Sequence, residues 1–192
     1  MPKVSDAHLA ARRDQILAAA ARCFARDGFH RTSMQDIVRE SGISAGLVYR
    51  YFAGKDDMIV AIVTEWHDQR RAPFRADDLI GNYLGLLRSI GDPGRRDDLR
   101  LGVQVWAEAL RSSQILDLVR SGADGPRADA ARALHGMTDL DPDALARVFV
   151  AIYQGLVLQT AWDETVDNAA VVDAVAAIVA RLLPDSAGEE LQ

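Results

Sequence analysis

The side chains with the most specific chemistry in this sequence lie in the segment Ser44–Phe52. Val48 and Phe52 are four residues apart, so they would share the buried face of a short helix. The opposite face carries two small residues and two that can hydrogen-bond: Ala45, Gly46, Tyr49 and Arg50. Small side chains let a helix backbone approach a grooved partner closely, and Tyr and Arg suit phosphates and base edges. This face therefore predicts contacts with nucleic acid.

A second helical pattern precedes this segment and positions it. Ser33 is a good N-cap, and Asp36, three residues later, forms a partial capping box with it. Gly42 can adopt the positive φ that ends a helix, and Ser44 can cap the next one. Two short helices joined by a tight turn are typical of a helix-turn-helix whose second helix enters a DNA major groove.

The stretch TSMQDIVRESGISAGLVYRYFAGKDDMI closely resembles the DNA-binding signature of the TetR family of bacterial transcriptional regulators. The resemblance runs from about Ala10 to Ile62. Its most specific parts are Gly42-Ile43-Ser44, Tyr49, Tyr51-Phe52 and Lys55. Beyond about residue 65 the resemblance is only to a chain length and a helical layout. It implies an all-α protein with a DNA-binding domain over residues 1–55 and a ligand-binding and dimerisation domain over residues 56–192.

The expected DNA contacts divide into base edges and phosphates. We expect Gln35, Ala45, Gly46 and Tyr49 to face base edges, with Ser44 beside them at the start of the second helix. The residues expected to bind phosphates are Ser33, Arg50, Tyr51 and Lys55. Ala45 and Gly46 cannot make bidentate hydrogen bonds with a base, so readout would also depend on DNA shape. Arg12 and Arg13, near the start of the first helix, either reach the DNA backbone or are simply solvated.

The charge distribution agrees with DNA binding at one end of the chain. The net charge is −6, but residues 1–55 hold nine Lys and Arg against five Asp and Glu, a charge of +4, and the remainder carries −10. Uneven charge is also common in any two-part protein. The single cysteine, Cys23, excludes an internal disulfide and suits a reducing cytosol. The sequence contains neither a signal-peptide pattern nor an apolar run of about 18 residues, so we expect a cytoplasmic protein with no membrane partner.

Helical periodicity continues through the rest of the chain, without a convincing strand pattern. The expected helices cover residues 7–27, 55–72, 77–90, 96–111, 113–119, 127–134, 142–162 and 168–183. Pro73 would end the second of these. Pro126 would begin a new helix after a break at residues 121–126.

The last two expected helices, 142–162 and 168–183, are apolar on more than one face and must therefore be covered from more than one side. One side can be the core of the subunit and the other a second subunit. The family resemblance likewise implies a homodimer through these two helices. The alternative is a wholly internal core.

A small-molecule inducer is the second expected partner, after a double-stranded DNA operator. Aromatic and apolar side chains spread over the body helices could form the walls of its pocket: Trp66, Tyr83, Trp106, Leu110, Tyr153 and Trp162. Taken singly, each aromatic is more often plain core. The histidines show no metal-ligand spacing, and no catalytic motif is recognisable, so we expect no cofactor, no metal and no enzymatic activity.

The sequence therefore predicts a ligand-responsive DNA-binding transcriptional regulator, a repressor that a small molecule releases from a palindromic operator. One alternative is a TetR-like regulator that has no ligand or that activates transcription. A second is a helical ligand-binding or catalytic protein in which the helix-turn-helix is incidental.

Overall fold

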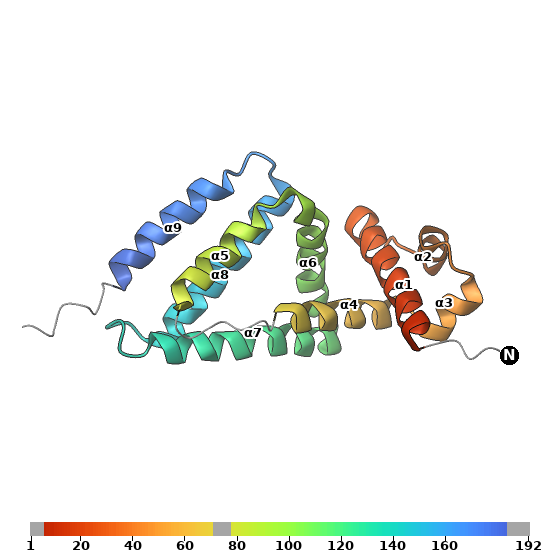
Figure 1. Cartoon of the computed structure of the whole chain (residues 1–192), viewed down its shortest axis with the longest axis horizontal. Coiled ribbons are helices and arrows are strands. Elements are labelled where there is room, and N and C mark those ends of the chain that lie inside the picture. Colours follow the sequence, from red (N-terminus) through yellow and green to blue (C-terminus); the bar gives the residue numbers. More distant parts are fainter. Residues whose placement is uncertain (1–5, 71–77, 184–192) are drawn as a thin grey trace, which may run out of the picture. The chain divides into compact units, whose positions relative to one another are not determined.

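The computed structural model describes residues 6–70 and 78–183, and over these residues the chain is built from helices and loops, without a strand (Figure 1). The all-α prediction is therefore confirmed for the described chain. The α-helices are α1 (Asp6–Asp27), α2 (Met34–Ser41), α3 (Ala45–Tyr51), α4 (Lys55–Arg70), α5 (Leu79–Ile90), α6 (Arg96–Ala109), α7 (Ser113–Leu134), α8 (Pro142–Trp162) and α9 (Asn168–Leu182). A short 3₁₀ turn, Pro93–Arg95, precedes α6.

The chain divides into two compact units. The first comprises residues 1–70 and 100–119, and the second comprises residues 71–99 and 120–192. Helices α6 and α7 therefore each begin in one unit and end in the other. The expected DNA-binding segment 1–55 lies within the first unit, together with α4 and the adjoining parts of α6 and α7.

The first unit has one apolar core, in which α1 packs against α2 and α4. Ile16 and Phe24 of α1 are fully buried there, as are Ile37 of α2 and Val48 of α3. Leu101 of α6 belongs to the same core. Because apolar side chains from six helices, α1–α4, α6 and α7, meet in it, the short helices α2 and α3 do not depend on their own helical propensity for stability.

Cys23 lies inside this core with no exposed surface. Burial raises the pKa of its thiol, and the neighbouring Arg26 lowers it by a smaller amount. Cys23 is therefore a small residue of the core.

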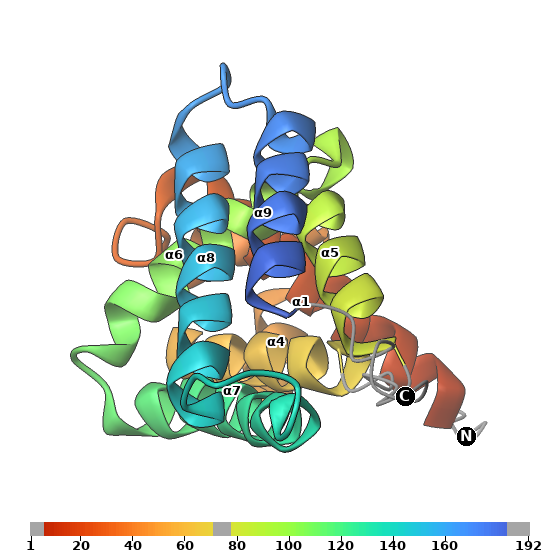
Figure 2. The ribbon, with the colours of Figure 1, turned by 90° about the vertical axis from the view of Figure 1, so that its left-hand side faces the viewer.

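In the second unit, α5 contacts both α8 and α9 (Figures 1 and 2). Tyr83 and Leu87 of α5 are buried, as are Phe149 of α8 and Val172 of α9. The end of α5 approaches the start of α9 so closely that a Cβ atom on Gly91 would lie 3.0 Å from the Cβ atom of Asn168. A side chain at Gly91 would therefore require Asn168 to shift slightly.

Helix α7 differs from the expectation. It runs unbroken from Ser113 to Leu134 with Pro126 inside it, whereas we expected two helices separated at residues 121–126. A proline inside a helix removes one backbone hydrogen bond and crowds the preceding turn, at a cost of about 3 kcal/mol. The Arg127 side chain, next to this proline, pairs with Asp124 one turn earlier and with Asp143 at the start of α8. The expected helix limits at Ala72, Pro73 and Asp77 lie outside the described residues.

Among the described helices, α8 alone has the length and apolar composition to cross a membrane. The sequence had predicted no apolar run of this length. Such a helix is weak evidence for a membrane segment, since core helices of soluble proteins meet the same criteria. Here Leu145, Phe149 and Leu156 of α8 are buried within the second unit. These contacts give the apolar residues of α8 a place in a protein core.

Candidate nucleic-acid interface

The first helix of the motif, α2, begins with the expected capping box. The backbone N–H of Ser33 donates to Asp36 Oδ2 at 2.9 Å, and the N–H of Asp36 donates to the Ser33 hydroxyl at 3.2 Å. The Ser33 hydroxyl also donates to Asp36 Oδ2 at 2.6 Å, and this bond, followed by the one from the Ser33 N–H and then by the contact with Arg39, holds the pKa of the Asp36 carboxyl below its ordinary value. Gly42 ends α2 at φ 66°, in the left-handed conformation.

The turn between α2 and α3 is fixed by Ser41. Its hydroxyl accepts a hydrogen bond from the N–H of Ile43 at 3.2 Å, and its carbonyl accepts one from Gln15 of α1 at 2.8 Å. Ile43 is buried, so the turn is attached to the core as well as to α1. Ser44 occupies the N-cap position of α3 as expected, but its side chain makes no capping hydrogen bond.

The second helix, α3, buries one face and exposes the other. Val48 is fully buried and Phe52, just past the helix end, is 5% exposed. The predicted base-facing and phosphate-facing side chains of this segment lie on the exposed face: Ser44, Ala45, Gly46, Tyr49 and Arg50. Ser33 and Gln35, at the start of α2, are exposed as well. Tyr49 is 53% exposed, which is unusual for an aromatic residue beside a well-packed core and leaves its ring available to a partner.

Tyr51 and Lys55 are half-buried and differ from the other predicted DNA contacts. The Tyr51 hydroxyl is buried and has no hydrogen-bond partner among the described residues. The Lys55 ammonium donates to the carbonyl of Phe29 at 2.8 Å and lies 4.9 Å from the centre of the Phe29 ring. The Lys55 side chain therefore has an internal partner in this structure. Sequence reasoning missed this contact because Phe29 is 26 residues away.

Arg13 also has an internal partner. Its guanidinium pairs with Glu65 of α4 and lies 5.7 Å from the centre of the Phe52 ring. Arg13 therefore links α1 to α4 and to the end of α3. Arg12 lies on α1 and hydrogen-bonds to Gln15 at 2.9 Å.

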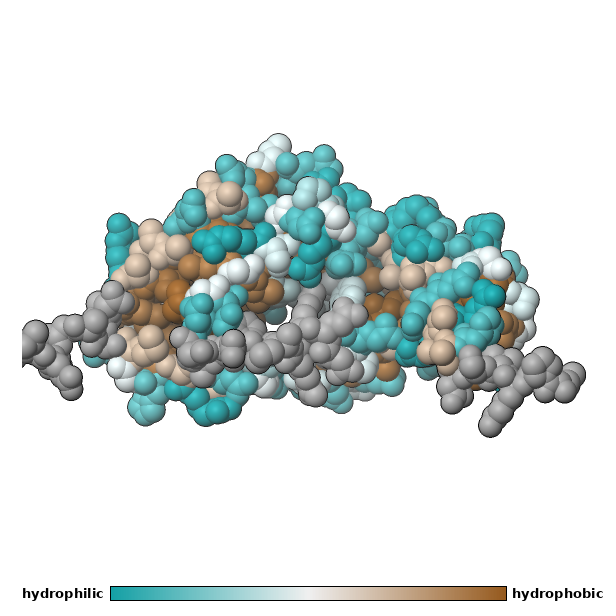
Figure 3. All heavy atoms as spheres, in the orientation of Figure 1, coloured by the Kyte–Doolittle hydropathy of each residue, from teal (hydrophilic) through white to brown (hydrophobic). Residues whose placement is uncertain are grey.

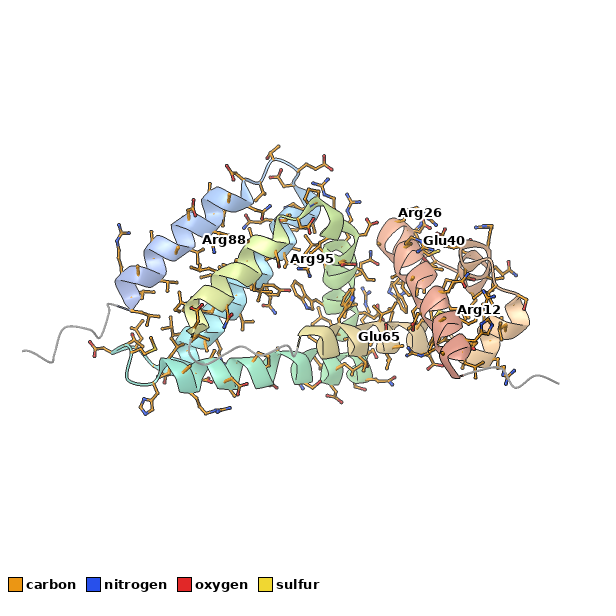
Figure 4. The ribbon with its side chains drawn as sticks, viewed as in Figure 1. Arg12, Arg26, Glu40, Glu65, Arg88 and Arg95 are labelled. Atoms are coloured by element: carbon orange, nitrogen blue, oxygen red, sulfur yellow. The ribbon has the colours of Figure 1, made fainter. Side chains whose placement is uncertain are left out.

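Ion pairs attach α2 to α1 on the outside of the core. Glu40 of α2 accepts hydrogen bonds from Arg22 at 2.9 Å and from Arg26 at 3.5 Å, and Figure 4 shows Arg26 and Glu40 close together. These contacts, that with Arg22 first, hold the pKa of the Glu40 carboxyl below its ordinary value. Pairs this exposed add little stability, so their main effect is on the orientation of α2.

The residues predicted to line a ligand pocket are divided between the two units. Trp66, Trp106 and Leu110 belong to the first unit, and Tyr83, Tyr153 and Trp162 belong to the second. Leu110 is 87% exposed and Trp162 is 67% exposed, so neither fits a wall of an enclosed pocket in this chain. Leu110 follows the last residue of α6 and Trp162 is the last residue of α8, which places both beyond the packed part of their helices.

Tyr83 is the most buried of the six. Its ring stacks on Phe149 with 4.9 Å between the ring centres, its hydroxyl donates to the Phe149 carbonyl at 2.8 Å, and burial raises its pKa. A small cleft of about 170 Å³ in the second unit is lined by residues at the α5–α6 and α8–α9 connections, and none of the six contributes to it. Among the described residues no group of three His, Cys, Asp or Glu side chains could hold a metal ion.

Comparison with known proteins identifies the class to which this arrangement belongs. Residues 16–62 match the model of bacterial regulatory proteins of the tetR family, and residues 86–184 match the model of the C-terminal region of BetI-type transcriptional repressors. The second match covers more than half of the chain. The chain belongs to the TetR family of bacterial regulatory proteins.

Individual relatives agree with this assignment. An HTH-type transcriptional repressor of Mycobacterium tuberculosis is 38% identical over 87 residues, 45% of this chain and 46% of the relative. The regulator YfiR of Bacillus subtilis is 43% identical over 118 residues, 62% of this chain and 55% of the relative. The chain thus spans about half the length of the curated relatives that it matches. A transcriptional regulator from Saccharomonospora viridis, solved in complex with choline, has the same fold, with a TM-score of 0.70 and 22% identity over 88% of this chain and 96% of that one.

Proposed function

We propose that this chain is a dimeric transcriptional repressor that binds a palindromic DNA operator and is released from it by a small molecule. The observation that carries the proposal is the two-sided character of α3. Its inner face is fixed by Val48 and Phe52, while its outer face presents Tyr49 and Arg50 between small residues. The buried face of α3 anchors the helix to the core, and the first residues of its exposed face, Ala45 and Gly46, are small. A helix of this kind suits insertion into a major groove.

The proposed contacts follow from exposure. We assign base-edge contacts to Tyr49, Gln35 and the backbone around Ala45 and Gly46. A Cβ atom on Gly46 would find no neighbour within 4 Å, so the exposed face at the start of α3 is open to DNA. Ser33 and Arg50 would bind phosphates, whereas the Tyr51 hydroxyl is buried and has no hydrogen-bond partner among the described residues. For Lys55 we assign only the backbone N–H groups at the start of α4 to DNA, because its ammonium is engaged by Phe29.

A second copy of the chain would cover α8 and α9. Val148 of α8 is 50% exposed, and Ile178 and Leu182 of α9 are 49% and 36% exposed. Figure 3 shows apolar surface gathered over α5 and α9 in the second unit. Apolar surface of this kind on helices that are buried on their other side is typical of a subunit interface. Val175, in contrast, is 7% exposed and packs within its own subunit.

The inducer has a first candidate from the solved relative, in which choline is bound. A quaternary ammonium is recognised by aromatic faces, and within the first unit the half-buried Trp66 and Trp106 could supply such faces. A regulator of this kind acts in the cytoplasm, where its operator is.

The experiment that tests the function starts from random double-stranded DNA. Selection by the purified protein should enrich a palindromic sequence, and affinity for it should exceed that for random DNA by about 10³-fold or more. Choline, betaine and a tetramethylammonium control are then titrated into the complex. If no sequence is enriched, the proposed function is refuted. If a sequence is enriched but none of these compounds changes the affinity for it, only a quaternary ammonium inducer is excluded.

A further inference from the structure

Helix α6 makes polar contacts with the DNA-binding part of the first unit through two side chains one turn apart, Gln104 and Glu108. The amide nitrogen of Gln104 donates to the carbonyl of Phe24 at 2.9 Å, and its amide oxygen accepts from the N–H of Phe29 at 2.9 Å. Glu108 Oε2 lies 3.0 Å from Nε2 of His30. These two residues form what we call the α6 clamp on the loop 28–30.

The loop 28–30 leads directly into the helix-turn-helix. The Thr32 hydroxyl donates to the carbonyl of Gly28 at 2.8 Å and approaches that of Cys23 at 3.2 Å, and Ser33 then caps α2. The turn after α2 is held by Ser41. Since each segment is attached to the next, the position of the loop relative to α6 determines where α2 and α3 lie relative to α6.

Apolar packing also joins α6 to this region, since Leu101 and Val105 share a core with Phe24 and Phe29. Apolar contact is non-directional, so it holds two elements together without fixing the angle between them. Hydrogen bonds weaken steeply away from their preferred geometry. The Gln104 amide makes one bond on each side of Gly28, and two such bonds define an orientation.

The other end of the same helix, Arg96–Leu99, belongs to the second unit, whose helices α8 and α9 carry the exposed apolar surface assigned above to dimerisation. We propose that Gln104 is a positioning residue that fixes the angle between the helix-turn-helix and α6 and thereby restricts the half-site spacing that the dimer accepts. This inference rests on the proposed function, because spacing has a meaning only for a dimer on a two-fold site, with recognition helices about one DNA turn apart.

The test measures affinity for the selected operator and for versions with one or two base pairs inserted or removed at its centre. Each inserted base pair moves one half-site by about 3.4 Å and rotates it by about 35°. The native protein should lose about tenfold in affinity per base pair, the scale of one mismatched position. Gln104→Met keeps the side-chain length but removes both hydrogen bonds, and it should lose less than about threefold. Its affinity for random DNA should not change.

Two further variants complete the test. Gln114→Met makes the same replacement at an exposed position at the start of α7 and should keep the native spacing profile. His30→Ala removes the second contact of the clamp at an exposed residue, so it should fold normally and broaden the profile partially. A merely structural role for Gln104 would lower thermal stability and leave the spacing profile unchanged.

A native-like profile for Gln104→Met overturns the proposal. If Gln104→Met does not fold, the spacing profile of His30→Ala is the test instead. A native-like profile for His30→Ala would then overturn the proposal. If the native protein itself shows no preference for spacing, the dimeric palindromic function fails instead of the role of Gln104.

Discussion

Replacement of Lys55 tests whether its ammonium stabilises the fold through Phe29 or binds a DNA phosphate. Lys55→Met retains most of the aliphatic chain and removes the ammonium that binds the Phe29 carbonyl and ring. A hydrogen bond to a charged group contributes about 1.5–3 kcal/mol. The cation–π contact would add up to about 1 kcal/mol, but the half-buried Phe29 carbonyl can recover a bond to water. We therefore expect a loss of about 2 kcal/mol, which is a fall of roughly 4–8 °C in Tm for a chain of this size.

DNA binding by Lys55→Met should keep the salt dependence of the native protein. Each phosphate neutralised contributes about 0.9 to the slope of log K against log salt, so the loss of one contact per subunit would lower the slope of a dimer by about 1.8. Arg50→Met is the matched control, because Arg50 is exposed on α3 and should show the opposite result, a flatter slope with an unchanged Tm. Calorimetry and fluorescence anisotropy at several salt concentrations measure both quantities. If Lys55→Met flattened the slope and left Tm unchanged, the internal role of Lys55 would be refuted. The result would instead support a contact between the Lys55 ammonium and a phosphate.

Three other predictions test the interface, the assembly and the cap of α2. Tyr49→Ala should weaken operator binding by about tenfold or more and random DNA binding much less, as measured by anisotropy titration on both DNAs; equal losses would remove Tyr49 from base readout. Ile178→Arg should yield folded monomers in light scattering, whereas Val175→Arg should lower Tm because it introduces a charge inside the subunit; folded dimers of Ile178→Arg would exclude α9 from the interface. The pKa of Asp36 is lowered on folding, so its contribution to stability is present above the unfolded value of about 3.9 and is lost as the pH falls through the folded pKa. The Tm of Asp36→Asn should therefore lie below that of the native protein at neutral pH and approach it in acid, and a pH-independent difference would contradict this linkage.

The local features of the DNA-binding region could be predicted from the sequence because they depend on neighbouring residues. The capping box of Ser33 and the left-handed conformation of Gly42 are both set within a few positions of the chain, and both are confirmed. The hydrogen-bonding partners of Lys55 and Gln104 lie 26 or more residues away, so no local pattern could indicate them. Position alone had suggested a phosphate contact for Lys55.

The helical body illustrates the same limit. The start of α8 at Asp141-Pro142 follows from local capping and is confirmed. The continuation of α7 through Pro126 has no local signal, since a proline ordinarily begins or breaks a helix. The exposure of Leu110 and Trp162 likewise depends on where the packing of neighbouring helices ends. The sequence indicated which residues are apolar and helical, but tertiary contacts decide which of them face a cavity, a partner or water.

The burial of Cys23 gives the protein a natural reporter of opening. It is the single cysteine in the chain and lies in the core shared by α1, α2 and α6, so a thiol reagent can reach it only when this core separates. The rate of labelling therefore measures the frequency of that event in the unaltered protein, without an introduced probe. Comparing the rate for the free protein with that in the presence of operator DNA, or of a candidate inducer, would show whether either partner tightens or loosens the part of the molecule that reads DNA.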